Sequence, residues 1–208
     1  MGRTRFGVCL PVFAGGSAWD YNVNFEVMKS KISECEERGF DSLWFPDHLT
    51  MGREGYNLEC WTVLSAASQL CESMRLGTLV LCPTHRPPAL LAKMAATLDV
   101  LSNGRLELGL GAGWRRSEQV SYGLPWEPSV KARVQRLIET VEIIRGMWTN
   151  EAFSFSGQYY DVKEAICNPK PIQKPSPRIW LAGKGEKLLL KTAVSYTHLR
   201  AHETVLDL

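Results

Sequence analysis

The chain has 208 residues, 45% of them hydrophobic and 22% charged, which are ordinary values for a globular protein and exclude disordered and fibrous classes. Its 24 basic and 22 acidic side chains leave a formal net charge of +2, so composition indicates neither a nucleic-acid nor a membrane-surface partner. No apolar run approaches the roughly 18 residues that span a bilayer, and the N-terminus shows no secretory signal pattern, so we expect a cytoplasmic protein.

Short strand-like and longer helix-like patterns alternate along the chain. Strands are predicted where a short apolar run stops at glycine, proline or polar residues, over 6–12, 42–45, 76–81, 105–110 and 179–181. Helices are predicted where apolar residues recur every three or four positions, over 24–38, from Glu59 through Trp61 and Leu64 to Cys71, over 89–101, over 130–148 and over 186–194. The first helix is expected to stop at Gly39, since glycine suits the left-handed position after a helix.

This alternation breaks after residue 148. Residues 153–162 have the pattern of a hairpin that turns at Ser156-Gly157, and we interpret its aromatic residues as hairpin packing. Residues 168–177 contain four prolines, which predicts an extended connector.

Five strands that are each followed by a helix predict parallel pairing with right-handed crossovers, in an α/β fold. The sheet is then either an open, doubly wound sheet or a barrel. The glycine string 109–113 argues against a nicotinamide-binding fold, because Trp114 stands where the third glycine of G-x-G-x-x-G belongs and the string follows the fourth strand. In a barrel, these glycines would let the backbone approach a ligand closely. The alternative is a tight turn with no ligand.

Polar or glycine-rich residues directly follow four of the predicted strands. These clusters are Asp47-His48, 82–85, 112–114 and 182–183. In a parallel barrel the carboxyl ends of the strands converge on one mouth, where active sites are built. The positions of the clusters therefore favour a barrel with a site at that mouth.

The cysteines and histidines do not predict a metal centre. The six cysteines form no C-x-x-C pair and are interpreted as reduced, mostly buried thiols. His198 and His202 are four residues apart, but no third ligand is evident, so we expect no metal.

Several segments resemble a known superfamily in the same order along the chain. FPDHL at 45–49 resembles the D-H motif after strand two of bacterial-luciferase-like enzymes, and AKMAATLDVLSNGR at 92–105 resembles their A-K-x-A-A-T-L-D-x-L-S-x-G-R segment. LGLGAGW at 108–114 is similar to the G-x-G-A-G-W signature of the branch that uses a deazaflavin, coenzyme F420. The resemblance covers about residues 5–194.

This resemblance implies a fold and an activity. The fold is a (β/α)8 TIM barrel of the bacterial-luciferase type, with about its first five β/α units in residues 1–194 and a hairpin inserted before strand five; 195–208 is interpreted as a non-native tail. The implied activity is hydride transfer between coenzyme F420 and an unidentified small organic substrate, in a parent protein that is a homodimer. The truncated chain by itself is expected to be inactive. The alternatives are an FMN-dependent luciferase-like monooxygenase and a non-catalytic flavin-binding relative.

The resemblance also implies coenzyme contacts, residue by residue. They are assigned to Asp47, His48, Cys82, Ala112, Gly113, Ala182, Gly183, Gly185 and Glu186. Cys82 is placed at a bulge of strand three, where the family often has a non-prolyl cis peptide.

His48 is the candidate catalytic residue, because imidazole titrates near neutral pH and can exchange the proton that accompanies hydride transfer. The alternative is a histidine that only hydrogen-bonds the coenzyme or Asp47. Trp114 is a candidate substrate residue, and it stands where the sugar-phosphate dehydrogenases of the family carry an acidic group, which argues against that reaction. Glu118 could serve instead, or could lie solvated in a first helical turn. His85 is a further substrate candidate, whereas Arg86 is expected to anchor its loop.

Overall fold

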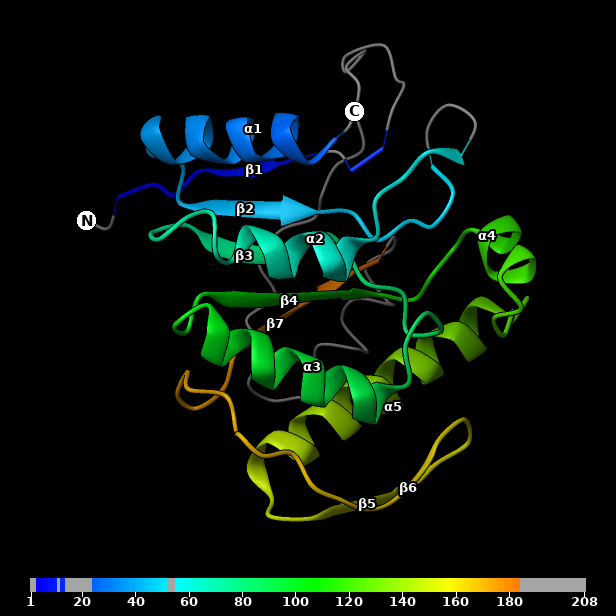
Figure 1. The fold of residues 1–208 in the computed structure, drawn as a ribbon. Coiled ribbons are helices and arrows are strands. Elements are labelled where there is room, and N and C mark those ends of the chain that lie inside the picture. The colour runs from blue at the N-terminus through cyan, green and yellow to red at the C-terminus, as the bar shows by residue number, and fades with distance from the viewer. Residues whose placement is uncertain (1–2, 11, 14–23, 52–54, 184–208) are drawn as a thin grey trace.

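The computed structural model describes residues 3–10, 12–13, 24–51 and 55–183. Five parallel strands form one sheet in the order β1-β2-β3-β4-β7 (Figure 1). Their bounds are β1 (Gly7–Cys9), β2 (Ser42–Phe45), β3 (Arg75–Thr78), β4 (Leu106–Gly111) and β7 (Arg178–Ala182). The predicted parallel pairing of five strands is confirmed.

The order of these strands distinguishes the two candidate architectures. Each strand of the sheet lies beside the preceding sheet strand, from β1 to β7, and the order never reverses. A doubly wound sheet reverses its order at the point where its ligand binds, whereas a (β/α)8 barrel adds strands in one direction. The described residues therefore have the winding of a barrel, as predicted, with β1 and β7 as the outer strands of the described sheet.

The helices follow the predicted ranges, with one addition. Their bounds are α1 (Phe25–Glu37), α2 (Cys60–Ala67), α3 (Pro88–Leu101), α4 (Arg116–Ser121) and α5 (Val130–Thr149). The N-cap residues of α1, α2 and α5 are Asn24, Glu59 and Ser129. Their side chains accept hydrogen bonds from backbone N–H groups of the first turn. The prediction that the second helix includes Cys71 was wrong, since α2 ends at Ala67, and α4 was not predicted.

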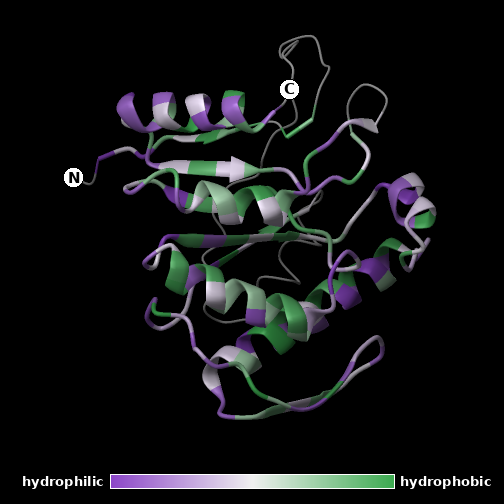
Figure 2. Cartoon of the chain, viewed as in Figure 1, coloured by the Kyte–Doolittle hydropathy of each residue, from purple (hydrophilic) through white to green (hydrophobic). Residues whose placement is uncertain are grey.

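Both faces of the inner strand β4 are buried, as barrel strands require. In β4 the buried leucines alternate with Glu107, Gly109 and Gly111. On the face of these alternate residues, the Trp44 ring lies against Gly77 and meets the Trp180 ring edge-on at 5.8 Å. The helices turn their apolar residues toward the sheet and their polar residues outward, most visibly in α1 (Figure 2).

A buried carboxylate joins three strands near the amino ends of β3 and β4. Glu107 is 2% exposed, pairs with Arg75, lies 3.3 Å from Arg178, and accepts a 2.7 Å hydrogen bond from Trp180 Nε1 to Glu107 Oε2. A buried carboxylate needs such partners because burying an unpaired charge is very costly. This cluster therefore ties β3, β4 and β7 together, at the end of the sheet opposite the candidate site.

The insertion after α5 is a hairpin, as predicted, of β5 (Phe153–Ser156) and β6 (Asp161–Ala165), and it lies beneath α5 in Figure 1. The loop of the hairpin spans 157–160 and is closed by a 2.9 Å hydrogen bond from Gly157 N to Tyr160 O. Its centre therefore lies two residues after the turn predicted at Ser156-Gly157. Buried Glu139 accepts hydrogen bonds from the backbone of this loop, which anchors the hairpin to α5.

Gly109 is expected to tolerate no side chain. A Cβ at this position would overlap the carbonyl oxygen of Thr78 on the neighbouring strand, so Gly109→Ala must push β3 and β4 apart. We expect a loss of about 3 kcal/mol in the free energy of unfolding, measured by urea titration. Gly111→Ala is the matched control, because the nearest atom to its Cβ would be a Val80 methyl carbon at 2.7 Å, whereas the backbone oxygen of Ala182 would lie at an ordinary 3.7 Å. Equal losses for the two variants would contradict this explanation.

The helix predicted over 186–194 and the tail predicted over 195–208 lie outside the described residues. Among the helices of the described residues, none is both long and apolar enough to cross a membrane.

Candidate functional site

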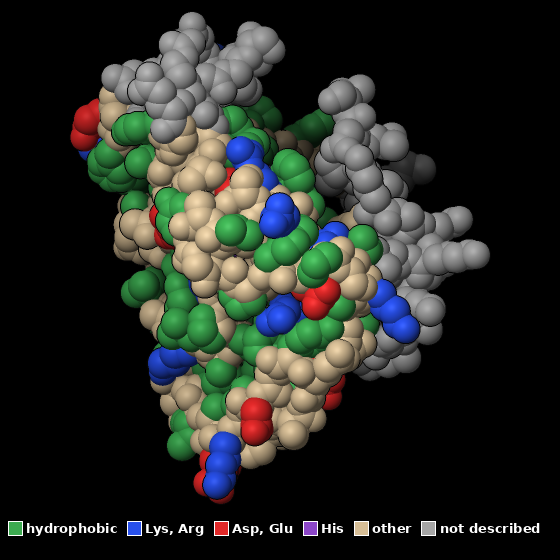
Figure 3. All heavy atoms as spheres, turned by 90° about the vertical axis from the view of Figure 1, so that its right-hand side faces the viewer, with side chains coloured by type: hydrophobic (Ala, Val, Ile, Leu, Met, Phe, Trp, Pro, Cys, Tyr) green, Lys and Arg blue, Asp and Glu red, His purple; other side chains and the backbone are tan. Residues whose placement is uncertain are grey.

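The carboxyl ends of β3, β4 and β7 lie level with one another. Leu81 pairs with Leu110, and Gly111 pairs with Ala182, so the three segments leave the sheet at the same end, which we call the carboxyl edge. The predicted coenzyme residues that follow these pairs are thereby brought together; they are Cys82, Ala112, Gly113 and Gly183. This edge is on the right of Figure 1, beside α4, and faces the viewer in Figure 3.

His48 lies at this edge after β2 and is paired with a residue 70 positions away. Its Nδ1 is 3.0 Å from Oε2 of Glu118 on α4, and its side chain is 19% exposed. Among the described residues, Nε2 of His48 has no hydrogen-bond partner. The carboxylate therefore fixes the ring through one nitrogen and leaves the other free to exchange a proton.

Glu118 is buried, not solvated as one interpretation of the sequence held. It is 2% exposed, and its Oε1 also accepts hydrogen bonds from the backbone N of Leu49 at 3.3 Å and of Thr50 at 3.1 Å. Burial acts to raise the pKa of Glu118, but the hydrogen bonds from His48 and Thr50 outweigh it and leave the pKa below its usual value. Glu118 is thus an ionised partner that orients His48.

Asp47 is enclosed by protein groups. Its Oδ2 accepts hydrogen bonds from the Cys82 backbone N at 3.0 Å and from Arg86 at 3.1 Å, and it lies 3.1 Å from His85 Nδ1. Its Oδ1 accepts a second hydrogen bond from Arg86, at 3.0 Å. Arg86 also pairs with Glu59, the N-cap of α2. Arg86 therefore anchors its loop, as expected, and the carboxylate of Asp47 joins the β2 and β3 loops.

The charges in this buried group stabilise one another. Burial acts to raise the pKa of Asp47, but the hydrogen bond from His85 and the charge of Arg86 lower it to about 2. Burial acts to lower the pKa of His85, but the hydrogen bonds and charges of Asp47 and Cys82 together raise it to about 10. At neutral pH the group therefore holds an ionised Asp47 between two cations. The His85 side chain is only 5% exposed and turned toward Asp47, and its contact with a substrate stays a prediction.

Cys82 follows β3 and lies against residues that follow β4. Its Sγ is 3.1 Å from Thr84 Oγ1 and 3.7 Å from Gln119 Nε2, and a Cβ on Gly113 would approach it to 2.6 Å. Burial acts to raise the pKa of Cys82, but contact with His85 leaves it below the usual value. The non-prolyl cis peptide joins Leu79 and Val80, three residues before the position expected for it. Gly113, at φ 73°, needs to be glycine both for its backbone and for the space taken by Cys82.

Sequence reasoning missed the partnership between His48 and Glu118. The helix that carries Glu118 has six residues, too few for a periodic apolar pattern. Trp114 is 69% exposed with its ring edge-on to His48 at a centroid distance of 5.9 Å, so it borders the candidate site. Gly185 and Glu186, predicted to contact the coenzyme, lie outside the described residues.

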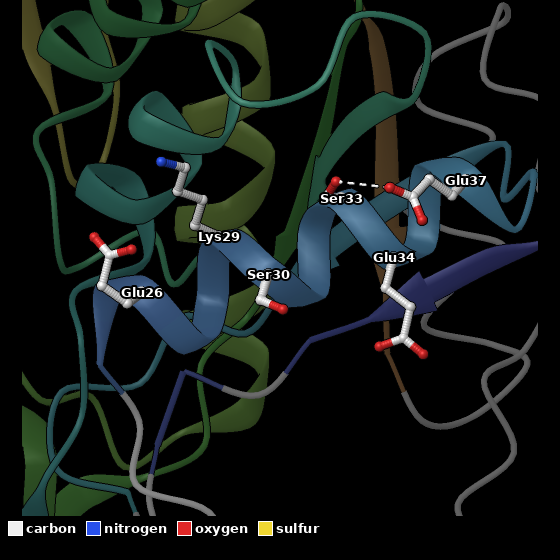
Figure 4. A pocket seen from close by; sticks show the side chains of 6 residues that line it. All are labelled: Glu26, Lys29, Ser30, Ser33, Glu34 and Glu37. Atoms are coloured by element: carbon white, nitrogen blue, oxygen red, sulfur yellow. Dashed lines mark hydrogen bonds between the residues drawn. The ribbon is translucent and has the colours of Figure 1, made fainter.

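A hollow lined by hydrophilic side chains lies elsewhere, on α1, and is formed by Glu26, Lys29, Ser30, Ser33, Glu34 and Glu37 (Figure 4). Its residues come from a single helix, and Glu34 is already paired with Lys31 and Arg38. Within the described ranges, no three histidine, cysteine or acidic residues are grouped as metal ligands would be. The edge that carries His48 is therefore the candidate site.

The sheet adds its parallel strands in chain order and carries its polar cluster at their carboxyl ends, and both features place the fold in the barrel class of enzymes. Comparison with family models identifies the group more closely: residues 4–196 match the luciferase-like monooxygenase model. The chain belongs to this bacterial-luciferase-like family, as its sequence predicted.

Curated relatives and a solved structure are similar to the chain. It is 36% identical over 154 residues to an F420-dependent glucose-6-phosphate dehydrogenase of Amycolatopsis mediterranei (strain U-32), covering 73% of this chain and 45% of the relative. It is 35% identical over 157 residues to an F420-dependent hydroxymycolic acid dehydrogenase of Mycobacterium tuberculosis (strain ATCC 25618 / H37Rv), covering 73% and 42%. An F420-dependent secondary alcohol dehydrogenase, solved with an F420-acetone adduct, superposes with a TM-score of 0.80 at 25% identity, covering 95% of this chain and 58% of the other. The chain thus spans about half the length of these proteins.

Proposed function

We propose that the whole protein is an F420-dependent oxidoreductase that transfers a hydride between the deazaflavin and a small organic substrate. The observation that carries the proposal is the His48–Glu118 pair, which holds an imidazole, whose Nε2 has no partner among the described residues, at the edge where the strand ends meet. Relatives and a structural neighbour named for F420 dependence support the choice of coenzyme. When bound, this coenzyme donates or accepts the hydride, and the protein supplies orientation and a proton route.

The described residues suit a flat ring system at this edge. Backbone of Cys82, Ala112 and Gly113 would line it, with His48 beside it, and the turn of Ala182 and Gly183 would continue the contact along β7. Gly185 and Glu186 remain predicted contacts of the coenzyme tail. Asp47 is proposed to position the Cys82 loop through its hydrogen bonds and not to touch the coenzyme, because its carboxylate is fully enclosed.

His48 is proposed to move the proton. When an alcohol is oxidised, Nε2 of His48 would take the hydroxyl proton, and in the reverse direction it would return that proton to the carbonyl oxygen. Glu118 would stabilise the imidazolium that forms, through its 3.0 Å contact with Nδ1. The parent protein is proposed to act in the cytoplasm as a homodimer.

Coenzyme titration tests this proposal. We expect the full-length protein to bind oxidised F420 with a micromolar or lower Kd, measured by quenching of deazaflavin fluorescence, and to bind FMN at least tenfold more weakly. Preferred binding of FMN with oxygen uptake would assign the protein to the monooxygenases instead. Coenzyme binding without turnover of any substrate would leave a binding protein. The same titration on the 208-residue chain measures how much of the coenzyme site these residues supply.

A further inference from the structure

One exposed aromatic ring borders His48, and a second lies against the neighbouring residue Leu49. Trp114 is 69% exposed and meets the His48 ring edge-on at 79° between planes. Tyr122, at the end of α4, is 56% exposed, and its hydroxyl donates to the carbonyl oxygen of Leu49 at 3.5 Å. Exposed large apolar side chains that gather beside a polar group mark binding surfaces. We refer to Trp114 and Tyr122 together as the aromatic rim.

The cations that contact the carboxylates of this site are already paired. Arg115 Nε lies 3.6 Å from Oε1 of Glu118, and Arg86 is paired with Asp47 and Glu59. His85 also lies against Asp47. A substrate phosphate or carboxylate needs arginine or lysine groups whose charge is not already neutralised. Figure 3 shows the same on this face: hydrophobic side chains lie among scattered charged ones of both signs, and the drawn lysine and arginine side chains form no single basic patch.

Arg116 is the adjacent cation to consider, because it is exposed at the start of α4. It follows Trp114 by two residues, but no described contact joins it to His48 or Glu118. Among the described residues, Arg116 is the cation beside Trp114 that a charged substrate could use. This residue therefore provides a direct way to distinguish a charged from an uncharged substrate.

We propose that Trp114 determines specificity and selects an uncharged alcohol or carbonyl compound with apolar substituents. The apolar part would lie on the aromatic rim, with the oxygen directed to Nε2 of His48. Oxidation of such an alcohol would break one C–H and one O–H bond and form a C=O bond: the proton would pass to His48, and bound oxidised deazaflavin would supply the acceptor of the hydride. This inference rests on the proposed function and adds the class of substrate.

The test uses the full-length protein loaded with F420 and a series of secondary alcohols from 2-propanol to 2-octanol, with glucose 6-phosphate as the charged probe. We expect kcat/KM to rise by up to about fourfold per methylene, since burying one methylene is worth about 0.8 kcal/mol. In Trp114→Ala, kcat/KM for 2-octanol should fall by about 10- to 100-fold, whereas that for 2-propanol should change by less than about threefold. Trp114→Phe should keep much of the preference, because it keeps an aromatic ring.

Leu101→Ala is the matched control, because Leu101 is an apolar residue, 58% exposed, at the far end of α3. It should leave the whole series unchanged. A preference for glucose 6-phosphate, or a rise in KM for that probe in Arg116→Ala, would overturn the inference. Failure of every alcohol and its ketone, in a protein that still binds F420, would overturn it too while leaving the coenzyme assignment standing. Loss of F420 binding in the wild-type protein would instead remove the proposed function itself.

Discussion

Replacing His48 with alanine is expected to lower kcat of the F420-loaded, full-length protein by about 10²- to 10⁴-fold, the usual contribution of one general acid–base group. The Kd for F420 should change by less than about threefold, because the removed imidazole contributes proton transfer and little of the binding surface. Steady-state kinetics and fluorescence titration measure the two quantities. Added imidazole should restore part of the activity, since it can occupy the space left by the side chain and carry the same proton.

Glu118→Gln supplies the matched control for this prediction. It keeps the shape of the side chain and removes the charge that faces Nδ1 of His48. Because Glu118 positions His48, we expect a smaller fall in kcat, about tenfold, with KM unchanged. An unaltered kcat in His48→Ala, or no rescue by imidazole, would mean that the histidine only fills space beside the coenzyme.

Replacing Asp47 with asparagine is expected to destabilise the protein by about 3–5 kcal/mol, because it leaves buried cations without their counter-charge. Urea unfolding of the full-length protein measures the loss. Adding Arg86→Met to Asp47→Asn should recover part of the lost free energy of unfolding, because the losses from removing the two partners of one buried pair are not additive. Additive losses in the double variant would show that the pair contributes nothing to stability as a pair.

The pH dependence of this effect follows from the two pKa values. Asp47 falls from an ordinary 3.8 to about 2, so its stabilisation is complete above about pH 4 and is lost as the pH falls toward 2. His85 rises from 6.5 to about 10, so its stabilisation is complete below about pH 6.5 and is lost as the pH rises toward 10. The difference between wild type and Asp47→Asn should therefore be largest between about pH 4 and 6.5. A difference that is flat from pH 3 to 10 would contradict the assignment.

Much of the fold could be predicted from the sequence because its local signals agree. The apolar run at 42–45 became β2 without a shift, and Asn24 and Gly39 delimit α1 as capping residues should. The barrel class followed from polar clusters after four strands. The ends of β1 and β3 were predicted too long, because the apolar pattern continues past Cys9 and Thr78, where the regular strands end; beyond β3 the chain continues as an isolated bridge between Leu81 and Leu110.

The candidate site was predicted less completely, for a physical reason. His48 and Asp47 were identified because both follow β2, but their contrasting environments depend on partners that are distant in sequence. Glu118 lies 70 residues from His48, and Arg86 lies 39 residues from Asp47. No local pattern in the sequence reveals which of two adjacent polar residues will be enclosed and which will keep a free nitrogen.

The short helix α4 has a consequence for how the family could diversify. Trp114, which borders the site, and Glu118, which orients His48, lie four residues apart on one stretch between β4 and α5. Changes after Gly113 in this stretch would alter the proposed substrate side of the site, while the Asp47–Arg86 group and the carboxyl ends of β3 and β7 come from other segments. Such an arrangement lets evolution exchange substrates one loop at a time without rebuilding the coenzyme site.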